Sequence, residues 1–143
     1  MNIYLDVDGV LLNHDGTLAN HADEFLAAMV HSGHPLHWLT TRCRDGDSSA
    51  VVAVLGRLAQ PSTVELLTSI KPTSWATSKL EAIELRSPFI WFDDQPLQFE
   101  IEELQECGLL DRWVKADLLS EPDQLGTLRM FGEWRCLGSG TLF

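Results

Sequence analysis

Two pairs of aspartates each follow an apolar run, and their spacing is typical of carboxylates that do chemistry together. Asp6 and Asp8 follow the first run, and Asp93 and Asp94 follow a later one. A carboxylate is already ionised at neutral pH and can attack phosphorus to form an aspartyl phosphate. A second carboxylate beside it can give a proton to the leaving oxygen and then take one from water. Phosphoryl chemistry is therefore the first expectation from these residues.

A third apolar run ends in polar residues that belong to the same expected site. Thr40, Thr41 and Arg42 lie where the run over residues 35–40 ends. Ligands of open parallel sheets bind at the carboxyl ends of the strands, so these side chains should converge with the aspartates. Carboxylates that meet in one cleft repel one another unless a cation lies between them. Oxygen ligands with room for water and phosphate suit Mg²⁺, so we expect a magnesium site.

An alternation of strand and helix patterns must position these residues. Apolar runs predict strands at residues 2–7, 35–40, 89–92 and 113–116, with a further short strand at 64–70. Helical spacing and capping residues predict helices at residues 20–32, 49–58, 73–85, 96–106 and 122–134. Strands that alternate with helices form a parallel sheet covered on both faces. The expected fold class is therefore α/β, a three-layer Rossmann-like domain over residues 1–143, with a β-hairpin flap at residues 10–18 turning at Asp15-Gly16.

Composition limits the partners of this chain. Its 143 residues correspond to one domain, and ten basic against twenty-one acidic residues give a net charge of −11. That charge repels nucleic acid and anionic membranes at long range. No apolar run reaches the roughly 18 residues of a membrane span, and residues 1–8 lack the pattern of a signal peptide. The three scattered cysteines form no CxxC pair, so we expect a cytoplasmic protein.

The first acidic motif resembles that of a known superfamily. An apolar strand followed by Asp6-Val7-Asp8-Gly9-Val10 resembles the DxDG[TV] motif of the haloacid dehalogenase superfamily of aspartate-nucleophile phosphatases and phosphotransferases. The resemblance implies that Asp6 is the nucleophile and Asp8 the general acid/base. It also implies that Mg²⁺ is held by the Asp6 carboxylate and the Asp8 backbone carbonyl. Dehalogenases and ATPases of the superfamily lack an acid at this second position, so Asp8 favours phosphoester hydrolysis or phosphoryl transfer.

Three further motifs follow in the order that the superfamily has them, up to Asp94. Thr40 matches the hydroxyl residue that binds the transferring phosphoryl group, with Thr41 as a register alternative. Lys79 matches the lysine that precedes the last motif, and Lys71 is its rival. The resemblance further implies that one of the two aspartates at the end of the last motif completes the metal shell and the other acts through water.

Substrate contacts are expected at the same edge of the sheet. We assign them to Gly9, Thr41 and Arg42, the last of which could bind a distal anion of the substrate. Neither interval between the motifs is long enough for a folded cap domain, so the chain resembles the capless members of the superfamily. An open site suits a bulky phosphorylated substrate. Three features together resemble a small bacterial group of hydrolase-like domains with relatives in RNA repair: Trp91-Phe92-Asp93-Asp94, the capless layout, and the ending with Leu125-Gly126-Thr127 and Trp134. The net charge disfavours RNA ends as the substrate.

Other interpretations of the motifs remain. Receiver domains also bind Mg²⁺ on aspartates, but their adjacent acidic pair follows the first strand, whereas here Asp93-Asp94 comes last. A catalytically degenerate relative would keep the fold and bind a phosphorylated partner, and a phosphotransferase would use an acceptor other than water. Apart from its two aspartates, the acidic stretch over residues 93–106 is expected to be a solvated helix face.

Overall fold

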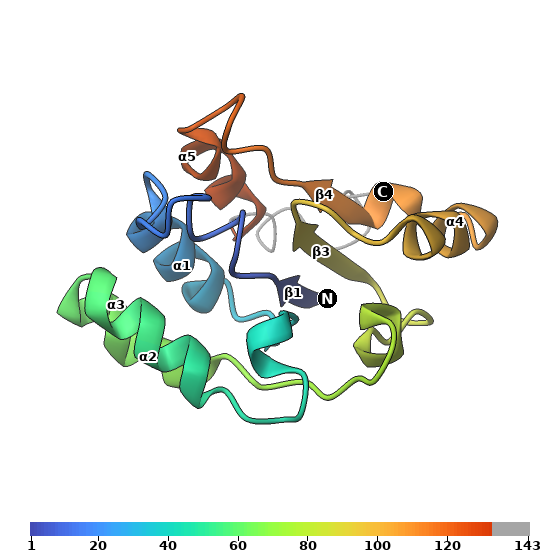
Figure 1. The fold of residues 1–143 in the computed structure, drawn as a ribbon, viewed down its shortest axis with the longest axis horizontal. Helices are drawn as coiled ribbons and strands as arrows, with labels where there is room; N and C mark the ends of the chain where they lie inside the picture. The colour runs from blue at the N-terminus through green and yellow to red at the C-terminus, as the bar shows by residue number, and fades with distance from the viewer. Residues whose placement is uncertain (133–143) are drawn as a thin grey trace.

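A four-stranded parallel sheet organises the chain in a computed structural model that describes residues 1–132 (Figure 1). The strands are β1 (Asn2–Leu5), β2 (Leu36–Trp38), β3 (Phe89–Asp93) and β4 (Trp113–Lys115). Their order is β2-β1-β3-β4, and every neighbouring pair is parallel. The expected α/β class with a parallel sheet is therefore confirmed, and the four long apolar runs become its strands.

Side chains that alternate along the strands build two separate cores. Ile3 and Leu5 of β1 pack in one cluster, whereas Tyr4 between them packs in the other. The same alternation separates Ile90 from Trp91 on β3. Because successive side chains of a strand point to opposite faces, both faces of this sheet are covered by apolar contacts.

Helices lie on both faces of the sheet. They are α1 (Ala22–His31), α2 (Ser49–Leu58), α3 (Pro61–Leu66), α4 (Gln98–Glu106) and α5 (Gln124–Leu128). Phe25 of α1 and Leu125 of α5 belong to the first core, and Leu104 of α4 belongs to the second. Figure 1 shows α1 and α5 on one side of the sheet and α4 on the other. This arrangement leaves the carboxyl edge of the strands for the loops that follow them.

The short strand expected at residues 64–70 is wrong. That stretch is the end of α3, followed by a 3₁₀ turn over Leu67–Ser69. Pro61 occupies the first turn of α3, where its fixed φ and missing N–H favour a helix start. Leu67 at the start of this turn packs in the first core. Its burial therefore comes from the turn that follows α3 and not from a strand.

The helix expected at residues 73–85 is also wrong, because only a 3₁₀ turn over Lys79–Ala82 forms there. Glu81 accepts hydrogen bonds from the backbone N–H groups of Ala76, Thr77 and Ser78. Side-chain bonds of this kind compete with the helical ladder and favour turns. The segment is therefore a loop followed by a 3₁₀ turn that Ser78 caps.

Two expected elements are shorter than the sequence indicates. Residues 10–18 reverse direction around Gly16, but Leu12 and Leu18 form a single antiparallel bridge, so no regular hairpin strands are present. The helix expected at residues 122–134 is α5 followed by a 3₁₀ turn over Arg129–Gly132, and Trp134 lies outside the described residues. Within residues 1–132, no helix has both the length and the apolar character needed to cross a membrane.

Candidate active site

The carboxyl ends of β1, β2 and β3 bring the predicted site residues to one edge of the sheet. The N–H of Asp6 donates to the carbonyl of Phe92 at 3.0 Å, and the N–H of Leu39 donates to the carbonyl of Leu5 at 2.7 Å. Asp6 therefore lies between Asp93, the last residue of β3, and Thr40, which follows the end of β2 by two residues. The expectation that these distant segments converge is met by the register of the sheet.

A buried lysine joins two of the aspartates. Lys79 Nζ lies 2.7 Å from Asp93 Oδ2 and 3.4 Å from Asp6 Oδ2. The lysine side chain is 12% exposed, and Asp93 is 1% exposed, so little water screens these charges. We call Asp6, Lys79 and Asp93 the buried triad. Lys71 instead bridges to His37 along the sheet and is exposed, so the structure places Lys79 and not Lys71 at the site.

Burial and charge set the ionisation of the buried triad. Burial raises the pKa of Asp6, the nearby Asp93 carboxylate raises it further, and the result is a pKa of about 7 despite the opposing effect of Lys79. Burial lowers the pKa of Lys79, but the two carboxylates outweigh that effect and hold it above its ordinary value. The lysine is therefore charged, and one positive charge does not fully offset two buried negative charges.

A buried carboxylate holds in place the 3₁₀ turn over Lys79–Ala82, which we call the lysine turn. Glu100 Oε2 accepts hydrogen bonds from the Ser78 hydroxyl at 2.9 Å and from the Lys79 N–H at 2.7 Å. Its Oε1 accepts from the N–H of Leu97, just before α4, at 2.9 Å. Glu100 is 1% exposed, so the interpretation of this stretch as a solvated helix face is wrong at this residue. The sequence does not show that Glu100 is buried, because the helical spacing of apolar residues carries no information about hydrogen-bond partners in a distant segment.

The second aspartate of the DxDG motif faces a different cation. Arg42 donates from Nε to Asp8 Oδ2 at 2.8 Å and from Nη2 to Asp8 Oδ1 at 2.9 Å. The Asp8 side chain is 53% exposed and that of Arg42 36%, so the pair is open to water. Hydrogen bonds from Arg42 hold the pKa of Asp8 below its ordinary value. We call these two residues the exposed pair.

The two threonines after β2 have different environments. Thr40 is fully buried, and its hydroxyl accepts the N–H of Arg42 at 3.2 Å as the cap of a 3₁₀ turn over Thr41–Cys43. Thr41 is exposed and lines a hollow with Lys79. Thr40 therefore orients the turn that carries Arg42, whereas Thr41 is the hydroxyl residue that faces the open side of the site.

Asp94 occupies space that exists because residue 9 has no side chain. Gly9 has a φ of +79°, a conformation that residues with a Cβ rarely adopt. A Cβ built at this position would overlap the carboxylate of Asp94. Burial raises the pKa of Asp94, and the neighbouring Asp93 raises it further. Gly9 therefore sets where the Asp94 carboxylate can lie.

Three carboxylates of the site form a group that fits a metal ion. One oxygen each from Asp6, Asp93 and Asp94 lies within 4.8 Å of the others. Asp8 is not part of this group, because its carboxylate lies against Arg42. With Asp8 included, this edge has four carboxylates, and the cations beside them are Lys79 and Arg42. When all four carboxylates are ionised, two negative charges are left for one divalent ion to balance. All of the side-chain donors are hard oxygens, which suits Mg²⁺ better than a thiophilic metal.

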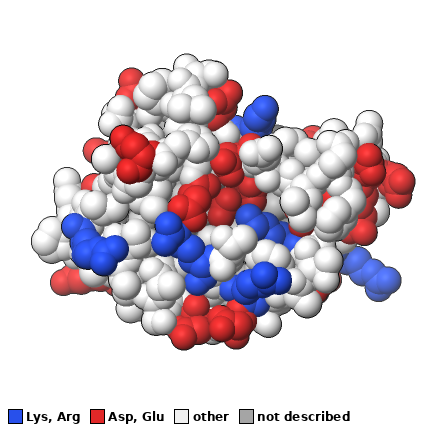
Figure 2. Space-filling model, in the orientation of Figure 1, with Lys and Arg blue, Asp and Glu red and all other residues white. Residues whose placement is uncertain are grey.

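Two of the hollows beside these carboxylates are each lined by one cation of the site, whereas a third, of about 570 Å³, is lined by Asp94 alone of the group. One, of about 350 Å³, is lined by residues 13–16 together with Asp8, Gly9, Arg42 and Asp94. The other, of about 150 Å³, is lined by residues that include Thr41, Trp75, Lys79 and Glu100. Figure 2 shows acidic side chains gathered near the centre of this face, over the region where β1 and β3 end, with basic side chains next to them. The described residues therefore leave open space next to the carboxylate group at both of these hollows.

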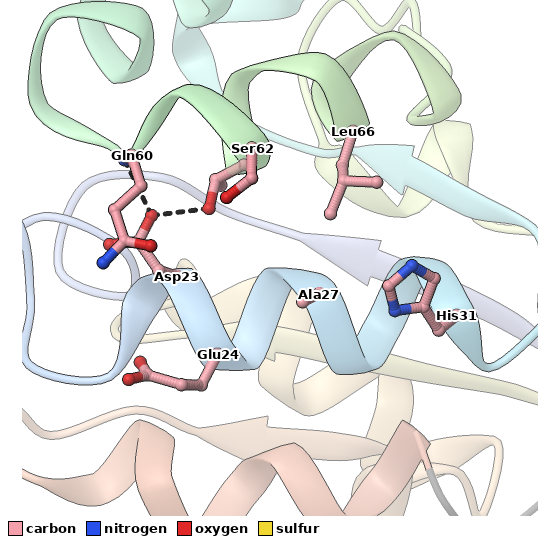
Figure 3. A pocket seen from close by; sticks show the side chains of 8 residues that line it. Asp23, Glu24, Ala27, His31, Gln60, Ser62 and Leu66 are labelled. Carbon is pink, nitrogen blue, oxygen red and sulfur yellow. Dashed lines mark hydrogen bonds between the residues drawn. The ribbon is translucent and has the colours of Figure 1, made fainter.

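A groove of about 380 Å³ between α1 and α3 shares no lining residue with this site (Figure 3). Asp23 of α1 accepts hydrogen bonds there from the Gln60 N–H at 2.9 Å and the Thr63 hydroxyl at 2.6 Å. The carboxylate is therefore already used to fasten α3 to α1. We interpret this groove as a helix contact and not as a second reaction site.

Comparison with known proteins adds no family to this geometry. A scan against protein-family models found no match, and searches of curated proteins and of solved structures found no significant match either. The site is therefore interpreted from its own residues.

Proposed function

We propose that this chain is a Mg²⁺-dependent phosphatase of the haloacid dehalogenase superfamily, which hydrolyses a phosphomonoester through an aspartyl phosphate. The observation that carries the proposal is the buried triad, in which the Lys79 ammonium lies between the first aspartate of the DxDG motif and Asp93. An ammonium in this position lowers the repulsion between a carboxylate nucleophile and a phosphate dianion.

The first half of the reaction is assigned to the two aspartates of the DxDG motif. An Asp6 carboxylate oxygen forms a bond to phosphorus while the bond to the leaving oxygen breaks. Asp8 gives its proton to that leaving oxygen, so an alcohol departs. In the second half, Asp8 takes a proton from water, and the resulting hydroxide attacks phosphorus and releases Asp6 with inorganic phosphate. Bound Mg²⁺ would neutralise charge on the phosphoryl oxygens.

The remaining residues hold the phosphoryl group and the metal. We assign Asp94 as a direct metal ligand, because Asp93 already accepts hydrogen bonds from Lys79 on one oxygen and from the Gln95 N–H on the other. Thr41 is the better placed of the two threonines to contact the phosphoryl group, because Thr40 is buried. Gly9 and Arg42 line the hollow of about 350 Å³, where the rest of the substrate would lie.

The exposed pair sets a condition on this mechanism. Asp8 bonded to Arg42 is held ionised and cannot donate a proton. It must therefore leave Arg42 and take up a proton from solvent before the leaving group departs, and an anionic group of the substrate that binds the guanidinium would release it. The same pair favours the second candidate function, a degenerate relative that uses Arg42 to bind a phosphorylated partner without turnover.

The substrate class follows from the shape of the site. The segments between β1, β2 and the lysine turn hold α1, α2 and α3, and Val51 and Leu55 of α2 lie in the first core. The described residues thus place no cap over the site, which suits a bulky phosphorylated substrate. RNA ends fit this openness but not the net charge of −11. Transfer to an acceptor other than water remains distinguishable from hydrolysis by product analysis with competing alcohols.

Turnover of an aryl phosphate with Mg²⁺ or with a chelator tests the proposal. We expect metal-dependent release of phosphate, and a loss of at least about 10³-fold in kcat for Asp6→Asn, which lacks the nucleophile. Asp111→Asn is the matched control, because Asp111 is an exposed aspartate that pairs with Arg112 and lines neither hollow of the site. Metal-independent turnover, or full activity in Asp6→Asn, would exclude this mechanism. Phosphopeptides, phosphorylated metabolites and RNA ends then serve as a substrate panel.

A further inference from the structure

We propose that Glu100 is a positioning residue that fixes the Lys79 ammonium against the two aspartates of the buried triad. The proposal rests on the function proposed above and adds to it a residue that lies outside every motif. It begins from burial, because a carboxylate that is 1% exposed must have compensating partners. Glu100 has no cationic partner among the ion pairs of the described residues, and three hydrogen-bond donors compensate it instead.

The two oxygens of Glu100 serve different segments. Oε1 accepts the N–H of Leu97, which ends the loop between β3 and α4. Oε2 accepts the Ser78 hydroxyl and the Lys79 N–H, which begin the lysine turn. The carboxylate therefore ties the turn that carries the ammonium to the loop that follows the aspartates.

These bonds close a ring that includes the site itself. Asp93 accepts the N–H of Gln95 on Oδ1, which fixes the start of the loop that Leu97 ends. Its Oδ2 accepts from Lys79 Nζ, so the ring returns to the lysine turn through the ammonium. A shift of the turn relative to α4 would open this ring at the Lys79–Asp93 contact. Misplacement of a reacting group by about 1 Å can cost 10²-fold in rate, so a fixed turn matters to kcat.

Glu100→Gln tests this role with little change in size. Glutamine has one acceptor oxygen and an amide nitrogen that cannot accept, so either Leu97 or the lysine turn loses its partner. We expect kcat to fall at least about tenfold while KM changes less than about threefold, because Glu100 is 1% exposed and lies outside the hollow that we propose for the substrate. Ser78→Ala is a milder variant that removes one donor to Glu100 and should move kcat in the same direction.

The matched control is Glu81→Gln. Glu81 also accepts three backbone N–H groups of this segment, but it is exposed and does not bond to the N–H of Lys79. We expect it to lower thermal stability and to leave kcat within about twofold. A kcat loss in Glu81→Gln equal to that in Glu100→Gln would overturn the proposal, because general loosening of the segment would then explain both.

A double-mutant cycle separates positioning from general support of the fold. In a Lys79→Met background, adding Glu100→Gln should change kcat less than about twofold, because the group that Glu100 positions is already gone. The same loss in both backgrounds would overturn the proposal. The cycle is repeated on Mg²⁺ affinity measured by calorimetry, where the two substitutions should again be non-additive. Absence of turnover in the unsubstituted protein would refute the phosphatase proposal, whereas additive effects on Mg²⁺ affinity would refute the role of Glu100.

Discussion

The buried triad and the exposed pair each combine aspartate with a cation, but they differ in how firmly they are held. Lys79 is fixed by a turn that Glu100 binds, and its ammonium contacts two carboxylates that water barely reaches. Arg42 reaches one carboxylate across an open hollow, and both side chains are at least one-third exposed. The first arrangement is built in advance, whereas the second can exchange its partner at little cost.

This difference matches the two tasks in the proposed reaction. A nucleophile needs a constant position and a constant countercharge, which the triad supplies. A general acid must face the leaving group in one step and water in the next, so it benefits from a partner that releases it. The comparison predicts that substitutions in the triad affect every substrate, whereas substitutions in the pair affect substrates selectively.

The largest effect that sharpens this comparison is expected from Asp8→Asn. For an alkyl phosphate with a poor leaving group, kcat should fall by about 10³-fold, because protonation of the leaving oxygen is lost. For an aryl phosphate, whose leaving group needs little protonation, the loss should be about tenfold. Steady-state kinetics with both substrates measure the ratio. Equal losses for the two substrates would show that Asp8 acts as part of the fixed site and would break the comparison.

Lys79→Met should lower kcat by about 10²-fold for both substrates, because it removes the ammonium from the nucleophile and retains most of the side-chain volume. Lys71→Met is the control, since Lys71 is exposed and only its backbone joins the sheet, in a β-bridge with His37. We expect it to stay within about twofold of the unsubstituted protein. A strong selectivity of Lys79→Met for one leaving group would contradict the view of the triad as a fixed electrostatic element.

A smaller effect is expected from Arg42→Ala, which frees Asp8 from its ion pair. With an aryl phosphate that carries no second anion, kcat should stay within about threefold, because the guanidinium is not part of the chemical step. With a substrate that carries a second anionic group, KM should rise by about fivefold or more. Parallel KM measurements on the two substrates decide this. A loss of about 10²-fold in kcat for both substrates would place Arg42 in the fixed part of the site.

The smallest effect concerns stability and pH. The pKa of Asp6 is raised to about 7 in the folded chain, and an unfolded aspartate titrates near 3.9. The folded state therefore binds more protons between these values, so the free energy of unfolding falls as pH rises from about 4 to about 7. Relative to Asp6→Asn, the metal-free protein should lose at least about 3 °C in Tm between pH 5 and pH 8, the shift for about 1 kcal/mol.

Thermal melts with a chelator and with Mg²⁺ check that expectation. At pH 8, Mg²⁺ should restore the stability of the unsubstituted protein, because it balances the buried carboxylates, and should stabilise Asp6→Asn much less. If Tm depends on pH equally in both proteins, the titration of Asp6 is not what destabilises the folded chain as pH rises. Asp8 titrates in the opposite sense, because Arg42 lowers its pKa, so only the difference between the two proteins is informative.

The sequence predicts the parts of this molecule that depend on patterns within one segment. The apolar runs before Asp6 and before Asp93 indicate β1 and β3, and the carboxylates that follow them meet because parallel strands end together. The predictions fail where side chains from distant segments decide the backbone. Glu81 holds residues 76–78 in a loop, and no periodicity reports it, although Ser78 and Glu81 together have the spacing of a capping box.

The same limit applies inside the site. Lys79 is predicted from its order among the motifs, but its preference over Lys71 becomes visible only when the ammonium contacts Asp93. The pairing of Asp8 with Arg42 joins residues far apart in the chain, and the sequence contains no signal for it. Glu100 likewise is a residue type typical of exposed helix faces, yet its side chain is buried in the structure. Charge alone does not distinguish these two situations.

The absent side chain at residue 9 has a consequence for how tolerance to substitution is interpreted here. A scan of all amino acids at every position would mark Gly9 as intolerant, as it would mark the proposed nucleophile Asp6, yet Gly9 contributes no reacting group. Its role is to leave a volume for the carboxylate of Asp94 on a backbone conformation that other residues resist. A map of intolerant positions in this chain would therefore outline empty space as well as chemistry. A smaller residue at position 94 would tell the two apart, because it should restore the thermal stability of a Gly9 variant without restoring its activity.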